Sequence, residues 1–116
     1  MIEVSYVRGD NPPHHHLLIR GHANAAPHGH DIVCAGVSAI AFALLGFLER
    51  QGGTDPAPEV TSGKLDIFSL VDDDRTAAAF EMAVIGLEQL ALHYPQCVGF
   101  RYFRDLADDT REKTPR

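Results

Sequence analysis

Residues 31–50 carry apolar side chains at intervals of three and four residues, and this period constrains the fold more than any other feature of the chain. The spacing predicts an α-helix with one buried stripe, formed by Val33, Val37, Ile40, Ala41, Leu44 and Leu48. We expect the helix to end near Arg50, because two glycines follow at positions 52 and 53. The longest apolar stretch, residues 32–48, is shorter than the roughly 20 residues that span a bilayer. We therefore interpret this segment as a core helix.

Two segments typical of strands precede the helix. Residues 1–7 alternate between apolar and polar side chains, and residues 15–20 contain an apolar cluster that ends at a glycine. Residues 9–13 between them are Gly-Asp-Asn-Pro-Pro, a composition that favours a turn. Residues 23–30 contain a proline and a glycine, so we expect a loop that leads into the helix.

The second half of the chain repeats this alternation of strands and helix. Residues 59–71 resemble a hairpin with Ser62-Gly63 as its turn. Three aspartates at 72–74 favour the start of a second helix, because carboxylates stabilise a helix N-terminus. Its core stripe is predicted to be Phe80, Val84, Leu87 and Ala91, and Tyr94-Pro95 is expected to end it. Residues 98–103 are predicted to form the last strand.

The predicted order ββαββαβ indicates an α+β fold. We expect two layers, a mostly antiparallel sheet with two helices packed on it. With 116 residues the chain has room for one core. Residues 1–104 are therefore expected to form a single domain, and residues 105–116 a charged tail.

Charge and cysteine content restrict the classes of function. Ten basic residues against sixteen acidic ones give a net charge of −6. This balance disfavours a protein that coats nucleic acid, whose surface would be basic. The N-terminus lacks the basic segment and apolar run of a signal peptide. Two cysteines do not indicate a disulfide framework. We expect a cytoplasmic protein with reduced thiols, without a direct nucleic-acid partner and without a membrane partner.

Six of the seven histidines lie between residues 14 and 30, close in sequence to the thiol of Cys34. His22 comes directly after Gly21, where the predicted second strand ends, and Cys34 lies in the first turn of the predicted helix. If the helix packs back along the sheet, the end of the strand and the start of the helix share one edge. The two side chains would then approach to hydrogen-bonding range.

Such a pair would make Cys34 a nucleophile and His22 its general base. The thiolate is the reactive form of cysteine, and a helix N-terminus and an imidazolium both stabilise it. With Asp31 as the N-cap, Cys34 would be the third helical residue. Backbone N–H groups there have no intrahelical acceptor and could bind the oxyanion of an acyl intermediate. Ser38, one turn further along the same face, would hydrogen-bond the thiolate or the substrate.

Each of these residues also has a structural interpretation. A single cysteine in a helix is most often a small core residue, which is what we expect of Cys97. His22 could be an ordinary loop histidine. Asp31 is fully explained by helix capping, and Ser38 could bond a backbone carbonyl one turn back.

A metal site competes for the same segment. Imidazoles and a thiolate are zinc ligands, and four of them would come from His22, His28, His30 and Cys34. Against this interpretation, the sequence has no paired cysteine spacing of the C-x-x-C type. We expect no metal and no other cofactor. The run His14-His15-His16 is interpreted as the solvated start of a strand.

Two motifs give the chain a resemblance to a known family. Gly21-His22-Ala23, followed by Asp31-Ile32-Val33-Cys34-Ala35-x-Val37-Ser38, resembles the bacterial ribosomal-processing cysteine protease family, Prp. The resemblance extends over most of the chain. The opening strand, the hairpin with Gly63-Lys64-Leu65, the aspartate-rich start of the second helix and Tyr94-Pro95 all fit the layout of that family.

The resemblance implies a homodimeric cytoplasmic cysteine protease whose catalytic pair is Cys34 and His22, with Asp31 and Ser38 in support. Members of the family remove a short N-terminal extension from a bacterial large-subunit ribosomal protein, number twenty-seven in the standard naming, during ribosome maturation. The implied partner is therefore the N-terminal peptide of that protein. The segment between the catalytic residues is expected to move when peptide binds, with substrate-loop residues Gly21, Ala23, Gly29 and His30. Gly29 would supply the hinge, because glycine tolerates unusual φ angles.

Two other functions remain open on the sequence. One is a non-catalytic, ribosome-associated protein-binding module on the same fold. The other is a small zinc-binding domain that uses the histidines and the thiol described above.

Overall fold

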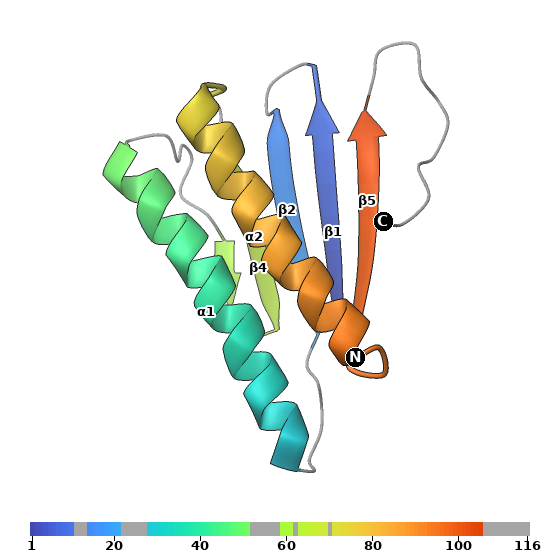
Figure 1. Ribbon diagram of the computed structural model, residues 1–116. Helices are drawn as coiled ribbons and strands as arrows, with labels where there is room; N and C mark the ends of the chain where they lie inside the picture. Colours follow the sequence, from blue (N-terminus) through green and yellow to red (C-terminus); the bar gives the residue numbers. More distant parts are fainter. Residues whose placement is uncertain (11–13, 22–27, 52–58, 62, 70, 106–116) are drawn as a thin grey trace.

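The structure is a computed structural model that describes residues 1–10, 14–21, 28–51, 59–61, 63–69 and 71–105. Its elements are, in order, β1 (Ile2–Gly9), β2 (His15–Arg20), α1 (His28–Gln51), β3 (Glu59–Thr61), β4 (Lys64–Ser69), α2 (Asp74–His93) and β5 (Val98–Asp105). Figure 1 shows both helices on one face of a sheet with strand order β3-β4-β2-β1-β5. Strands β1 and β5 pair in parallel, and the other neighbouring strands pair antiparallel. The predicted two-layer α+β fold and its order ββαββαβ are confirmed.

The core lies between the sheet and the two helices. Alternate residues of β1 and β2 face it, because successive side chains of a strand point to opposite faces. These are Ile2, Val4, Tyr6, His15, Leu17 and Ile19. The helices contribute most of the predicted stripes, which are buried at Val33, Val37, Ala41, Leu44, Leu48, Phe80, Val84 and Leu87. The other two predicted members, Ile40 and Ala91, are partly buried and pack against this core. The hydrophobic period therefore predicted which face of each helix packs on the sheet.

Helix α2 begins and ends where its sequence indicates. The Asp73 side chain caps the helix by accepting a hydrogen bond from the Thr76 N–H at 2.8 Å. That hydrogen bond lowers the pKa of the Asp73 carboxyl below its ordinary value. At the other end, Tyr94 is the C-cap, and its N–H donates to the carbonyl of Leu90.

Helix α1 begins earlier than predicted. It starts at His28, so the prediction of a loop over 23–30 is wrong for residues 28–30. Backbone hydrogen bonds hold a helix together, so its first turn needs no apolar side chain. The apolar period marks only where the helix meets the core.

The length argument against a membrane span is also wrong. The segment Ile32–Gln51 is long and apolar enough to cross a bilayer by length and composition alone. Instead, the burial of one face of α1 against the sheet supports a core helix.

Strand β5 is longer than predicted. It continues beyond residue 103 to Asp105, because Arg8 and Gly9 of β1 pair with Arg104 and Asp105. The remaining tail, 106–116, lies outside the described residues. The hairpin of β3 and β4 agrees with the prediction, and Gly63 adopts a φ of +81° before β4 begins.

Candidate functional site

Cys34 lies beside a cavity of about 220 Å³ at one end of the sheet. Its thiol is free and partly buried. The cavity is bounded by the starts of β1 and β4, the end of β2 and one side of α1. Its lining residues are Ile2, Ile19, Gly21, Cys34, Val37, Ser38, Phe42, Gly63, Lys64 and Leu65. The structure therefore brings the end of β2 and Cys34 to the same cavity.

Gly21 fixes the chain at the edge of this cavity. Its φ is +91°, and a Cβ atom at this position would lie 2.4 Å from the carbonyl oxygen of Met1. Its N–H donates to the carbonyl oxygen of Gly63 at 2.9 Å. Glycine is the residue that fits both the dihedral angle and the close approach. The backbone immediately before His22 is thus held against β1 and the start of β4.

Cys34 is not at the helix terminus as predicted. Because α1 begins at His28, Asp31 lies within the helix and is not its N-cap. Cys34 is the seventh helical residue, beyond the first turn whose N–H groups lack intrahelical acceptors. The predicted use of free helix-terminal N–H groups as an oxyanion site beside Cys34 is therefore wrong.

Ser38 and Phe42 continue the face of α1 that carries Cys34. The three residues are spaced by four, which places them in one row along the helix. All three line the cavity. Ser38 thus supplies a hydroxyl on the same wall as the thiol, in agreement with its predicted placement.

Sequence reasoning missed Phe42 and Lys64 as cavity residues. The spacing of Phe42 from Cys34 was a signal that could have found it. Lys64 had no local signal, because it reaches the site through the pairing of β4 with β2, in which it lies opposite Arg20. Gly63 was predicted as a turn residue without a place at the site.

Several predicted site residues are not placed by the structure. His22 and Ala23 lie outside the described residues, so the imidazole of the predicted catalytic pair has no position here. Gly29 and His30 belong to α1 by their backbone, which places the predicted hinge inside a helix. The Asp31 side chain, like that of His30, is not described. Among the residues that are described, no group of three or more His, Cys, Asp or Glu side chains could hold a metal ion.

The three adjacent histidines lie at the other end of β2, and the prediction of a solvated start of that strand is wrong for His15. Its side chain is 1% exposed. The register explains the burial, because His15 is in phase with Leu17 and Ile19, the inward-facing residues of β2. His16 points to the opposite face and pairs with Asp66 of β4 at 2.5 Å.

His15 belongs to a buried polar group at the start of α2. Its Nδ1 lies 2.7 Å from the hydroxyl of Tyr6, and its ring stacks on Phe80 with centroids 4.8 Å apart. Burial raises the pKa of Tyr6 to about 12, so the phenol keeps its proton and its O–H donates a hydrogen bond to Nδ1. The Nε2–H then faces Asp72, with 3.4 Å between Nε2 and Oδ1. Burial lowers the pKa of His15 below 6.5, although Asp72 opposes that shift.

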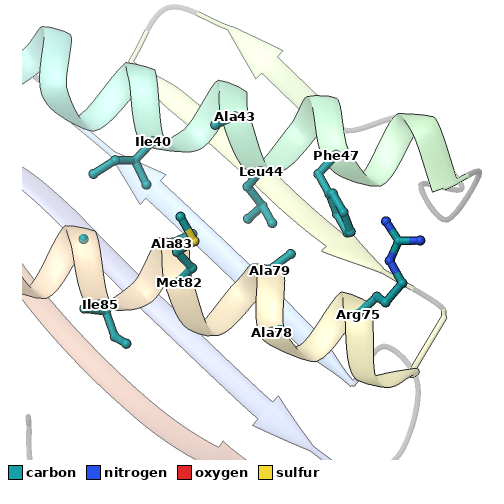
Figure 2. A pocket seen from close by; sticks show the side chains of 11 residues that line it. Ile40, Ala43, Leu44, Phe47, Arg75, Ala78, Ala79, Met82, Ala83 and Ile85 are labelled. Atoms are coloured by element: carbon teal, nitrogen blue, oxygen red, sulfur yellow. The ribbon is translucent and has the colours of Figure 1, made fainter.

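A larger hollow lies on the outer side of the helical layer. A groove of about 760 Å³ lies between α1 and α2. Figure 2 shows Phe47 and Arg75 facing each other at one end of it. The Arg75 guanidinium lies 5.4 Å from the centre of the Phe47 ring, within cation–π range. Of the described residues that line the groove, only Arg75 is charged. The groove contains neither thiol nor imidazole among these residues, so the chemistry belongs to the smaller cavity.

The cavity beside Cys34 combines a nucleophile with an apolar binding surface. Ile2, Ile19 and Leu65 supply apolar walls. The polar side chains among the α1 residues of this lining are the Cys34 thiol and the Ser38 hydroxyl. Such a site is suited to hold a side chain of a substrate while a thiol attacks a neighbouring carbonyl.

Comparisons with known proteins agree with this arrangement. Residues 1–99 match the family model described as cysteine protease Prp. A ribosomal processing cysteine protease Prp from Mycoplasma pneumoniae is 32% identical over 87 residues, which cover 75% of this chain and 86% of the relative. The Prp of Staphylococcus aureus is 26% identical over 107 residues, 88% of this chain and 99% of the relative.

A solved structure of the same family has a similar fold. A crystal structure of the Prp protease from S. aureus, in complex with a covalently linked product peptide, aligns with a TM-score of 0.73. The two chains are 26% identical, and the match covers 88% of this chain and 99% of the other.

Proposed function

The chain belongs to the cysteine protease Prp family, and from this membership we propose that it removes the N-terminal extension of bacterial large-subunit ribosomal protein number twenty-seven during ribosome maturation. The observation that carries the proposal is the free Cys34 thiol, which shares one cavity with Gly21, the residue before His22. A cysteine and a histidine at such an edge provide a nucleophile and its base. The S. aureus relative has been solved with a covalently linked product peptide, which supports a peptide as the substrate.

In the proposed mechanism His22 takes the proton of the Cys34 thiol, and the thiolate attacks the carbonyl carbon of the scissile bond. The tetrahedral intermediate collapses to a thioester as His22 gives that proton to the leaving amine. Water, deprotonated by His22, then hydrolyses the thioester and releases the extension as a carboxylic acid. Ser38 would hydrogen-bond the thiolate or the substrate from its place one turn after Cys34. Asp31 belongs to the first turn of α1, and in this proposal it has a supporting role beside the catalytic pair.

Charge supports a basic substrate. The net charge of −6 creates a field that attracts a cationic ribosomal-protein segment and steers its encounter with the enzyme. The proposed substrate is made and assembled in the cytoplasm, which supports the cytoplasmic location expected from the sequence. The same charge argues against a direct contact with ribosomal RNA.

The test is cleavage of a synthetic peptide that spans the N-terminal extension and the first mature residues of this organism's own copy of the ribosomal protein. Mass spectrometry of the products should show cleavage at one bond by the wild type. Cys34→Ala should reduce the rate by more than about a thousandfold, as expected for loss of a nucleophile. Cys97→Ala is the matched control, because it makes the same chemical change at a buried core thiol, and it should cleave at the same bond.

Other outcomes would support the two alternative functions. Tight binding of the intact peptide by the wild type, without cleavage, would identify a protein-binding module. One equivalent of zinc per chain after purification without chelators, lost in Cys34→Ala, would identify a zinc domain.

We also propose that the enzyme is a homodimer and that the α1–α2 groove is its interface. The groove alternates protruding and small side chains along α2. Met82 is 77% exposed and Ile85 49% exposed, whereas Ala78 on the same lining has a small side chain. A two-fold contact requires one surface to complement itself. Protruding and small side chains on the same helix allow Met82 of each copy to enter the groove of the other.

Sedimentation measurements should therefore report a dimer for the wild type and a monomer for Met82→Glu, because a buried carboxylate in an apolar interface is costly. Leu92→Glu changes an exposed leucine outside the groove and should leave the dimer intact. A monomeric wild type at micromolar concentrations would contradict the proposal.

A further inference from the structure

Phe42 is an aromatic residue at the catalytic cavity for which the proposed chemistry has no role. Its side chain is 51% exposed, although α1 buries its other face in the core. It also lines the cavity that contains Cys34 and Ser38. An exposed aromatic ring on the lining of the nucleophile's cavity is placed to contact substrate, and its contribution to the core is small.

The distance between Phe42 and Cys34 along α1 can be converted into a number of residues of a bound peptide. Phe42 follows Cys34 by two steps of four residues. At a rise of about 1.5 Å per residue, the two Cα atoms lie about 12 Å apart along α1. An extended peptide advances about 3.3 Å per residue. A peptide that runs along this row therefore spans it with three or four residues.

The opposite wall of the cavity also fits an apolar side chain. Gly63, Lys64 and Leu65 form that wall at the start of β4. Leu65 is 9% exposed and belongs to the hydrophobic core. Lys64 is out of phase with Leu65 along β4, so it borders the cavity through its backbone. Gly63 has no Cβ, and the side chain on this wall is therefore that of Leu65. A peptide held between α1 and β4 would thus place one side chain against the Phe42 ring.

We propose that Phe42 forms a remote substrate subsite, which binds an apolar side chain three or four residues from the bond that Cys34 attacks. The inference rests on the proposed peptidase function and adds a specificity determinant to it. Binding energy from this subsite is present in both the ground state and the transition state, so its loss should raise KM and leave kcat unchanged.

The experiment uses an internally quenched peptide that spans the same ribosomal-protein extension, with alanine placed in turn at each position up to four residues on either side of the scissile bond. Phe42→Ala should lower kcat/KM for the parent peptide by about tenfold, the effect of one apolar contact, through KM. One peptide of the series has alanine in place of the side chain that binds Phe42, three or four residues from the scissile bond. On that peptide Phe42→Ala should lower kcat/KM no further. Phe42→Leu should recover most of the activity. Leu92→Ala, which truncates an exposed leucine on α2, should behave as the wild type.

Two results would overturn the subsite. Phe42→Ala could cleave the parent peptide as fast as the wild type, or it could lose the same factor on every peptide of the series. A wild type that cleaves none of the peptides would instead contradict the peptidase function. The subsite would then be judged by fluorescence anisotropy of labelled peptide on Cys34→Ala. Weaker binding by the Phe42→Ala, Cys34→Ala double variant supports it, and equal or absent binding refutes it.

Discussion

Gly21 is the residue at which the sequence motif and the backbone geometry coincide. Its φ is positive, and a Cβ would lie close to the Met1 carbonyl, so any other residue at this position would be strained. Its N–H also ties the end of β2 to Gly63. A substitution here therefore displaces the chain at the point where it continues into His22. The glycine of the Gly-His-Ala motif has a positioning role that follows from space and dihedral angle.

We expect Gly21→Ala to lower the free energy of unfolding by about 1–3 kcal/mol, the range for a residue forced into such a conformation. The rate of cleavage of the extension peptide should fall by more than the fraction of unfolded protein accounts for, because a shift of the backbone at residue 21 displaces His22. Urea denaturation measures the loss of stability. Initial rates of cleavage, taken at a temperature about 20 °C below the midpoint of thermal unfolding, measure the loss of activity separately.

Gly46→Ala is the matched control for this substitution. No described atom lies within 4 Å of a Cβ at Gly46, and alanine favours a helix over glycine by about 0.5–1 kcal/mol. Its stability should rise and its rate of cleavage should stay the same. Equal stability of Gly21→Ala and the wild type would show that the assigned strain is absent.

At the scale of elements, local chemistry predicted most boundaries. The bounds of β2 were predicted as observed, since a turn sequence precedes it and Gly21 follows it. Helix α2 was predicted by its aspartates and by Tyr94-Pro95, and the structure confirms the cap at each end. The start of α1 could not be predicted from the apolar period, because its first turn does not contact the core. The error in one boundary moved Cys34 by a full turn relative to the helix terminus.

The sequence predicted the reactive residues of the candidate site on α1 but not the β4 wall of its cavity. Cys34 and Ser38 follow from motif and spacing, and the structure places both at one cavity. The β4 wall depends on the pairing of β2 with a strand distant in the sequence, for which the sequence carries no local signal. His15 had a signal that was overlooked, because a residue in phase with Leu17 and Ile19 faces the core.

Helix α1 offers a stabilising substitution close to the nucleophile. A Cβ at Gly36 would lie 3.5 Å from a methyl carbon of Leu90 on α2, an ordinary packing distance. Gly36→Ala should therefore raise the free energy of unfolding by about 0.5–1 kcal/mol, measured by urea denaturation. Gly86→Ala makes the same change where a Cβ would lie 3.0 Å from Ile40. Overpacking there should cancel the gain, so equal gains in both variants would contradict this account of the helix contact.

At the scale of the whole molecule, β2 separates a catalytic end from a buried polar end. The cavity with Cys34 lies where β2 finishes, and the group of Tyr6, His15 and Asp72 lies where it begins. The polar group fastens β1 and β2 to the start of α2. Its hydrogen bond is formed with His15 neutral, so the stability of the entire fold depends on the protonation of this side chain.

We expect the protein to lose stability as the pH falls below about 6.5. Burial lowers the pKa of His15 in the folded state from 6.5, against the opposing effect of Asp72 and with the help of Arg8 and His14. Below pH 6.5 the unfolded chain therefore binds a proton that the folded chain does not. The contribution of neutral His15 is fully present above pH 6.5 and is lost as the pH falls toward the folded-state pKa.

Thermal unfolding between pH 7.5 and 5 should show this dependence in the wild type and a shallower one in His15→Gln, which keeps a hydrogen-bonding partner for Tyr6. His93→Gln removes an exposed histidine at the end of α2 and should retain the wild-type profile. Parallel profiles for His15→Gln and the wild type would show that His15 is not the titrating group.

The parallel pairing of β1 with β5 has a consequence for the synthesis of this enzyme. Among the described strands β1 is translated first and β5 last, yet Ile2 lies opposite Val98 and its N–H donates to the carbonyl of Cys97. While the chain grows, the side of β1 that pairs with β5 has no partner. The sheet that carries the cavity is therefore closed on this side only when β5, the last of the described strands, has left the ribosome.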